Sequence, residues 1–187
     1  MAFLLVPLGI LLLLVLWIVG VFNGLVRARN ACDESWAGID TELKRRHDLV
    51  PNLVETVKGY AAHERGTLEA VIQARNTAAA PQASPAAAAQ AENALSAGLR
   101  QIFALSERYP DLKANASFQQ LQGALADTED RIQRARTVYN GNVRALNTSI
   151  EVFPGNMVAN SFGFSRREFF ELKDAEQREA PKVSFKA

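Results

Sequence analysis

The sequence has few of the residue types on which metal binding and catalysis depend. It contains a single cysteine, Cys32, and only two histidines, His47 and His63. A structural zinc site takes four ligands from cysteine and histidine, so a zinc cluster of that kind is excluded. His63 and Glu64 begin a zincin-like pattern, but Thr67 stands where that pattern requires its second histidine. We therefore expect no metal site.

Motifs that bind phosphates or activate a nucleophile are also missing. Neither G-x-G-x-x-G nor G-x-x-x-x-G-K-[ST] occurs, and there is no G-x-S-x-G elbow. The 21 basic and 20 acidic side chains give a formal net charge of +1, so no overall field attracts nucleic acid. We expect no catalytic residues, no cofactor and no nucleic-acid partner.

Charge is absent from the whole N-terminal segment between Ala2 and Phe22. As a helix, a segment of about 20 apolar residues matches the roughly 30 Å hydrocarbon core of a bilayer. A cleaved signal peptide would instead have a basic start, a shorter apolar stretch and a cleavage site of small residues, and none of these is present. The sequence therefore predicts an uncleaved anchor over residues 1–24 that holds the chain in the lipid bilayer.

Basic residues near the anchor predict its orientation. Arg27 and Arg29 follow the apolar segment, residues 44–46 add three more basic side chains, and none precedes it. Because cytoplasmic flanks are enriched in lysine and arginine, the N-terminus is expected outside and the rest of the chain in the cytoplasm.

Beyond the anchor, apolar residues recur every three or four positions, which is typical of amphipathic helices. This spacing predicts four helices, over about 25–77, 87–108, 115–153 and 156–177. Pro51 should kink or interrupt the first, and either Asn115 or Ser117 can cap the third. The predicted fold class is all-α, with an N-terminal transmembrane helix followed by a long antiparallel four-helix bundle over residues 25–179. Residues 180–187 are expected to form an extended tail.

Several blocks of the sequence resemble the LemA family. They are LKRRHDLVPNLVETVKGYA at 43–61 with His63-Glu64, YPDLKAN at 109–115, FQQLQ at 118–122, EDRI at 129–132 and the closing PKVSF at 181–185. The resemblance covers nearly the whole chain. It implies a bacterial single-pass membrane protein with an antiparallel helical bundle, in a family without an established activity or catalytic residues.

Two groups of residues are candidates for contact with a partner. Adjacent Phe169 and Phe170 would point about 100° apart on a helix, so either one aromatic is exposed or a wide aromatic stripe seals the bundle. A dense charged patch on the third predicted helix is the second group, and its ordinary interpretation is a solvated face. The candidates are Phe162, Phe164, Phe169 and Phe170, together with Glu129, Arg131 and Arg134.

Three functional hypotheses follow from these features. The first is a membrane-anchored scaffold or adaptor of the bacterial cell envelope, without catalytic activity, that contacts other envelope proteins. The alternative is a small-ligand-binding or hydrolytic bundle, which requires Arg46, His63, Glu64 and Tyr139 to converge on one pocket. The third is self-association through exposed helix faces. Asn142, on the apolar seam of the third predicted helix, is expected to pair with a polar group, as a buried amide must.

Overall fold

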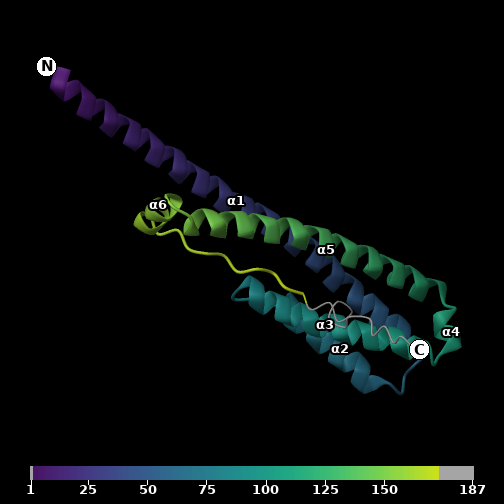
Figure 1. Cartoon of the computed structure of the whole chain (residues 1–187). Helices are drawn as coiled ribbons and strands as arrows, with labels where there is room; N and C mark the ends of the chain where they lie inside the picture. Colours follow the sequence, from purple (N-terminus) through teal and green to yellow (C-terminus); the bar gives the residue numbers. More distant parts are fainter. Residues whose placement is uncertain (1, 173–187) are drawn as a thin grey trace, which may run out of the picture. The chain divides into compact units, whose positions relative to one another are not determined.

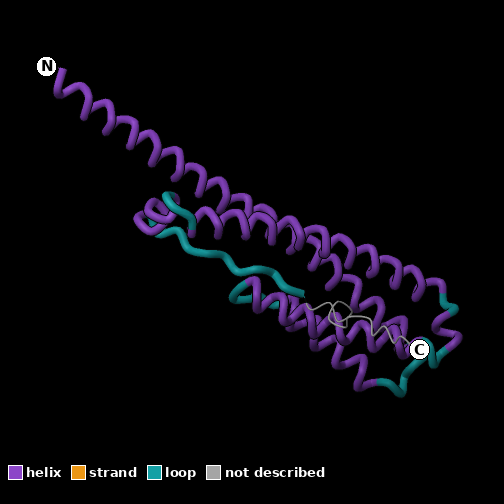
Figure 2. The backbone as a smooth tube through the Cα atoms, in the orientation of Figure 1, coloured by secondary structure: helices purple, strands orange, loops and turns teal. Residues whose placement is uncertain are grey.

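The computed structural model describes residues 2–172, with side chains from Val6 onward, and the predicted tail 180–187 lies outside this range. Every regular element in the described range is a helix, which confirms the all-α class (Figure 1). The helices are α1 (Ala2–Lys58), α2 (Arg65–Ala79), α3 (Pro85–Ser106), α4 (Pro110–Lys113), α5 (Ala116–Glu151) and α6 (Gly155–Ser161). Figure 2 shows the loops that separate them.

Contacts divide the chain into two compact units. The first combines Met1–Leu49 with Gln120–Phe169, and the second combines Val50–Gln119 with the residues from Phe170 onward. Two of the three divisions fall within a helix, because α1 and α5 each contribute to both units, and the third follows Phe169. The arrangement of the long helices as one four-helix bundle, and the division of the chain at residues 24 and 179, remain predictions.

The N-terminal part of α1 is long and apolar enough to cross a membrane, and it is the one helix of this kind among the described residues. Its large apolar side chains between Val6 and Val19 are exposed, except for the half-buried Ile18. Burying so much apolar surface in hydrocarbon is favourable, whereas water would leave it solvated at a cost. This helix is therefore the candidate membrane span among the described residues.

Pro51 does not end α1, which continues to Lys58. The pyrrolidine ring lies on the exposed side of the helix, while the adjacent Val50 and Leu53 are fully buried and hold this part of the chain. The interruption comes later, at residues 59–64, and divides the predicted helix 25–77 into α1 and α2. Gly59 begins this turn, as expected of a residue with low helix propensity.

In the first unit, α5 runs antiparallel to α1. Three contacts along the pair show the direction: Ala31 with Asn142, Trp36 with Tyr139, and Arg46 with Glu129. The Asn142 amide donates hydrogen bonds of 3.1 Å to the Ala31 carbonyl and of 3.1 Å to the Ser35 hydroxyl. The expected polar pairing of this seam amide is thus confirmed, and it fixes the register of the two helices.

In the second unit, α2 and α3 form a helical hairpin joined by residues 80–84. A side chain at Gly98 would meet the Val71 methyl at 2.9 Å, so glycine is what allows the two helices to approach closely. Ser84 caps α3 by accepting a hydrogen bond from the Ala87 amide at 3.3 Å. The predicted helix 87–108 is thereby confirmed, with its start two residues earlier.

The predicted helix 156–177 is wrong, because α6 ends at Ser161 and residues 162–172 are not helical. Gly163 adopts a φ of 71°, in the left-handed region that favours glycine. The Phe164 amide donates to the Ala159 carbonyl at 2.9 Å, the bond that defines a Schellman C-terminus. Gly163 is therefore a helix stop and not a position within the helix.

Replacing Asn115 should destabilise the protein, because its side chain accepts a 3.0 Å hydrogen bond from the Phe118 amide at the start of α5. We expect Asn115→Ala to lower the free energy of unfolding by about 1 kcal/mol in a denaturant titration. Ser117→Ala is the matched control and should change it by less than about 0.5 kcal/mol, since Ser117 is exposed. Equal effects of the two variants would contradict this assignment of the cap.

Candidate functional site

The chain that follows α6 is held against the first unit by one buried amide. We call Phe164–Phe169 the strap. Asn147 on α5 accepts a 2.9 Å hydrogen bond from the Arg167 backbone amide and donates a 3.0 Å bond to the Arg167 carbonyl. The Tyr139 hydroxyl donates to the Glu168 carbonyl at 2.9 Å. These side chains replace the backbone partners that an isolated extended segment lacks, so they fix its course.

Ion pairs attach the strap on both sides. The Arg167 guanidinium lies 2.7 Å from Asp33 on α1, and Arg166 lies 3.0 Å from Glu151 at the end of α5. All four side chains are at least 40% exposed, so each pair contributes at most about 1 kcal/mol. The buried Asn147 contact therefore orients the strap more firmly than the salt bridges do.

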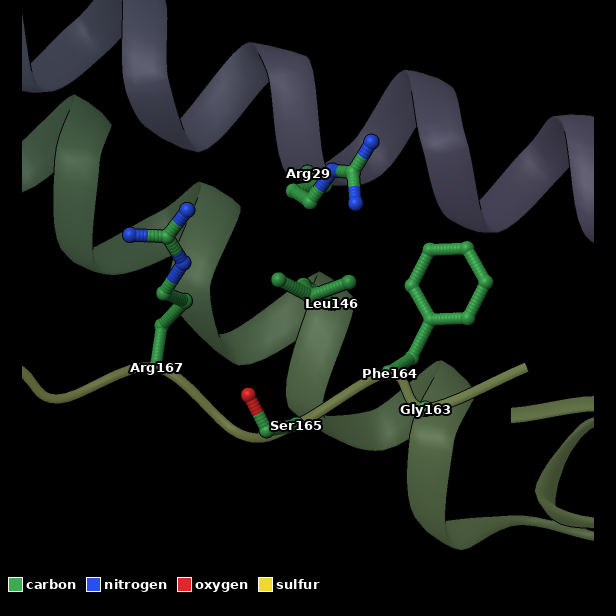
Figure 3. Close-up of a pocket in the computed structure, with 6 residues that line it drawn as sticks. All are labelled: Arg29, Leu146, Gly163, Phe164, Ser165 and Arg167. Carbon is green, nitrogen blue, oxygen red and sulfur yellow. The ribbon is translucent and has the colours of Figure 1, made fainter. Parts of the chain in front are cut away.

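A pocket of about 330 Å³ opens where the strap begins, between α1 and α5 (Figure 3). Its lining residues are Arg29, Leu146, Gly163, Phe164, Ser165 and Arg167. The Arg29 guanidinium lies 5.5 Å from the centre of the Phe164 ring, a cation–π geometry. Arg167 is paired with Asp33, so Arg29 is the lining arginine that has no ion pair with another described residue.

Aromatic side chains pack against one another next to this pocket. Phe22 on α1 contacts Phe162 at 4.9 Å and Phe164 at 5.7 Å between ring centres, both edge to face. Phe162 is exposed, whereas Phe170 is fully buried. Phe169 is half-buried. The four predicted aromatic contacts lie outside any helix, so the expected 100° separation of Phe169 and Phe170 does not apply.

The charged candidates on α5 divide into two kinds. Glu129 forms an ion pair of 3.1 Å with the buried Arg46 of α1. Arg131 and Arg134 are exposed, and neither has an ion pair with another described residue. Arg131 and Arg134 thus present their charge outward, while Glu129 belongs to the packing of α1 against α5.

Three of the four residues required by the ligand-binding alternative have their own structural partners. Arg46 pairs with Glu129, and Tyr139 bonds the strap ten positions further along α5, about 15 Å away at 1.5 Å per residue. In the second unit, Glu64 accepts hydrogen bonds from Arg108 at 3.1 Å and Tyr109 at 3.4 Å. Arg46 and Tyr139 are therefore apart within the first unit, and neither lines the pocket beside Arg29.

Two titratable groups in the first unit are held neutral by burial. Burial raises the pKa of the Cys32 thiol, an effect that nearby Arg167 partly opposes. Burial likewise raises the pKa of the Tyr139 hydroxyl to about 12. Within residues 2–172, no three histidine, cysteine, aspartate or glutamate side chains are placed to hold a metal ion.

Sequence reasoning missed Asn147 and the role of Arg167. Asn147 follows Leu146, a core position, so the three-to-four spacing alone assigns it to the edge of the seam. The signal available in the sequence was an asparagine at or next to the apolar seam. Asn142 was interpreted in this way, and Asn147 was not. Nothing in the sequence could pair Asn147 with a residue 20 positions away, because that contact depends on the turn at Gly163.

A sequence model of the LemA family matches residues 35–185. The chain belongs to the LemA family. The protein LemA of Metamycoplasma hominis is 26% identical over 162 residues, which cover 85% of this chain and 73% of that protein. This relative extends the likeness across both units.

Magnetosome proteins are also similar to part of this LemA family member. MamQ 1 and MamQ 2 of Paramagnetospirillum magneticum are each 32% identical over 77 residues, and MamQ of Magnetospirillum gryphiswaldense is 31% identical over the same length. Each match covers 41% of this chain and 28% of the magnetosome protein. The chain thus matches less than a third of the length of these relatives.

Removing the Asn147 amide should release the strap. We expect Asn147→Ala to destabilise its attachment by about 1–3 kcal/mol, because two hydrogen bonds to the Arg167 backbone are lost. Limited trypsin digestion followed by mass spectrometry should then show faster cleavage after Arg166 and Arg167. Ser149→Ala serves as the control, since Ser149 bonds only within α5. Unchanged cleavage would show that the Tyr139 hydrogen bond and the ion pairs hold the strap without Asn147.

Tyr139 should make stability depend on alkaline pH. Unfolded tyrosine ionises near pH 10, whereas the folded hydroxyl keeps its proton to about pH 12. The unfolded state therefore loses its proton first, and the stabilisation from Tyr139 is complete below pH 10 and lost as the pH rises to 12. In urea titrations at pH 8, the free energy of unfolding of the wild type should be about 1 kcal/mol higher than that of Tyr139→Phe. A pH-independent difference between them would contradict this.

Proposed function

We propose that this protein is a membrane-anchored scaffold or adaptor of the bacterial cell envelope, without catalytic activity of its own. The N-terminal part of α1, which is long and apolar enough to cross a membrane, supplies the anchor. The α1/α5 pair supplies a surface that other envelope proteins contact. The observation that carries the proposal is a stripe of exposed side chains on α5, and we name it the α5 stripe: Arg131, Arg134 and Val138.

The α5 stripe follows helical geometry. Its members are separated by three and four positions, so they share one side of the helix. Each is exposed, and Val138 is 59% exposed although it is apolar. The neighbouring Ile132 and Tyr139 face the core instead. Two arginines beside an exposed apolar side chain suit a protein partner that offers a small apolar contact flanked by carboxylates.

The proposed orientation places the N-terminus outside and the two units in the cytoplasm. Arg27 and Arg29 are the first charged residues after the apolar segment, and both are exposed. Their position supports retention of this flank on the cytoplasmic side. A protein of this kind crosses the membrane once and brings its partner to the inner surface.

The other two hypotheses have less support. A ligand-binding or hydrolytic bundle requires its four polar residues to meet, whereas Arg46, Tyr139 and Glu64 each contact a different structural partner. Self-association remains compatible with the α5 stripe only if the partner carboxylates come from a second copy of the chain. The test of the adaptor proposal separates self-association from contact with another protein.

We would replace Val138 with a photo-crosslinking amino acid in the full-length protein and irradiate native membranes. The adaptor proposal predicts one or a few discrete adducts that contain another envelope protein. The matched position is Glu69, an exposed residue of α2, which should give none of these adducts.

Charge variants then test the recognition. Arg131→Glu with Arg134→Glu should abolish the adduct, while Arg131→Lys with Arg134→Lys should retain most of it, since lysine preserves the charge. Identical adducts at Val138 and Glu69 would count against the proposal. An adduct made only of two copies of this chain would replace it with self-association.

A further inference from the structure

The segment between Glu151 and Arg166 carries no charge. Its 14 residues include no acidic, basic or histidine side chain. Apolar residues within it stand in the open: Val152 is 51% exposed, Phe153 77%, Met157 61% and Phe162 57%. We call these four residues the apolar corner. Scattered exposed apolar residues are normal, but four within 11 positions form a patch that needs a cover.

The apolar corner lies level with the end of the membrane anchor. The Phe162 ring contacts Phe22 at 4.9 Å, and Phe22 closes the uncharged apolar segment of α1. Met157 and Phe162 belong to or directly follow α6, and Val152 and Phe153 lie between α5 and α6. Where α1 leaves the hydrocarbon, the apolar corner is therefore beside it. The contact between Phe162 and Phe22 therefore places the bilayer surface next to the apolar corner.

Positive charge lies on the side of the apolar corner away from the anchor. Arg29 is seven positions beyond Phe22, about 10 Å along the helix, and its guanidinium lies over Phe164. Arg27 is also exposed, whereas Arg166 and Arg167 are occupied by Glu151 and Asp33. Apolar and aromatic side chains toward the bilayer, with arginines behind them, match the interfacial region of a phospholipid membrane.

We propose that the apolar corner is a second membrane contact. It inserts its exposed side chains into the headgroup and upper acyl region of the leaflet from which α1 emerges, and Arg29 and Arg27 reach the lipid phosphates. The inference rests on the anchoring part of the proposed function. It adds that the turn joining α5 to α6 binds lipid too, so the first unit is held to the membrane at two places.

The experiment measures the depth of single residues in the full-length protein. A Cys32→Ala background receives one new cysteine at Phe153 or Met157, labelled with an environment-sensitive fluorophore after reconstitution into vesicles of phosphatidylethanolamine and phosphatidylglycerol. Quenching by a nitroxide attached to the lipid chains is compared with quenching by aqueous iodide. Leu12→Cys reports the anchor, and Val138→Cys is the matched exposed control on α5.

The labels at Phe153 and Met157 should emit at shorter wavelength than the label at Val138. They should also be quenched by the lipid nitroxide and protected from iodide, as at Leu12. If they behave like Val138 while Leu12 remains quenched by lipid, the second contact is overturned and the anchor stands. Protection from both quenchers means that protein covers the patch, which also overturns the inference. Loss of lipid quenching at Leu12 would overturn the anchoring itself.

Discussion

The structure of the first unit depends on the continuity of α1. One helix carries both the apolar segment between Val6 and Phe22 and the surface on which α5 packs. Because a helix rises about 1.5 Å per residue, every contact along α1 has a defined distance from the end of the apolar segment. Phe162 meets α1 at Phe22, Asn142 at Ala31 and Glu129 at Arg46. The anchor thus determines how far from the membrane each part of α5 lies.

Polar contacts set this register more than surface charge does. Asn142 and Asn147 are five positions apart on α5 and act in different directions, the first on the α1 backbone and the second on the strap. An unpaired amide at either place would lose its solvation without compensation, which strongly disfavours other registers. The exposed ion pairs of Arg166 and Arg167 add little by comparison. The two amides therefore fix the register of α1, α5 and the strap, whereas apolar packing alone permits more than one register.

Periodicity in the sequence was sufficient for α3 and α5. The predicted 115–153 lies within two residues of α5 at both ends, because its seam is long and Asn115 and Pro154 mark its limits. Local signals were weaker for the other two predictions. Apolar spacing continues through Gly59, so it conceals the turn before α2, and the aromatic residues after Asn156 suggested a helix that Gly163 stops. The anchor can be predicted from the absence of charge alone. The strap cannot, because it depends on contacts between residues 20 or more positions apart.

The two proposed surfaces lie far apart: the α5 stripe is within α5, and the apolar corner follows the end of that helix. Phe153 follows the end of α5, and Arg134 lies 19 positions earlier, about 30 Å along the axis. The α5 stripe has two arginines, and guanidinium groups are costly to bury in hydrocarbon. The apolar corner has no charge, and its exposed apolar side chains are costly to leave in water. A partner on the α5 stripe would therefore be held about 30 Å from the membrane-facing end of the helix, within reach of the bilayer surface but clear of the headgroups. If both proposals hold, that separation would let one helical pair bind lipid at one end and protein along its side.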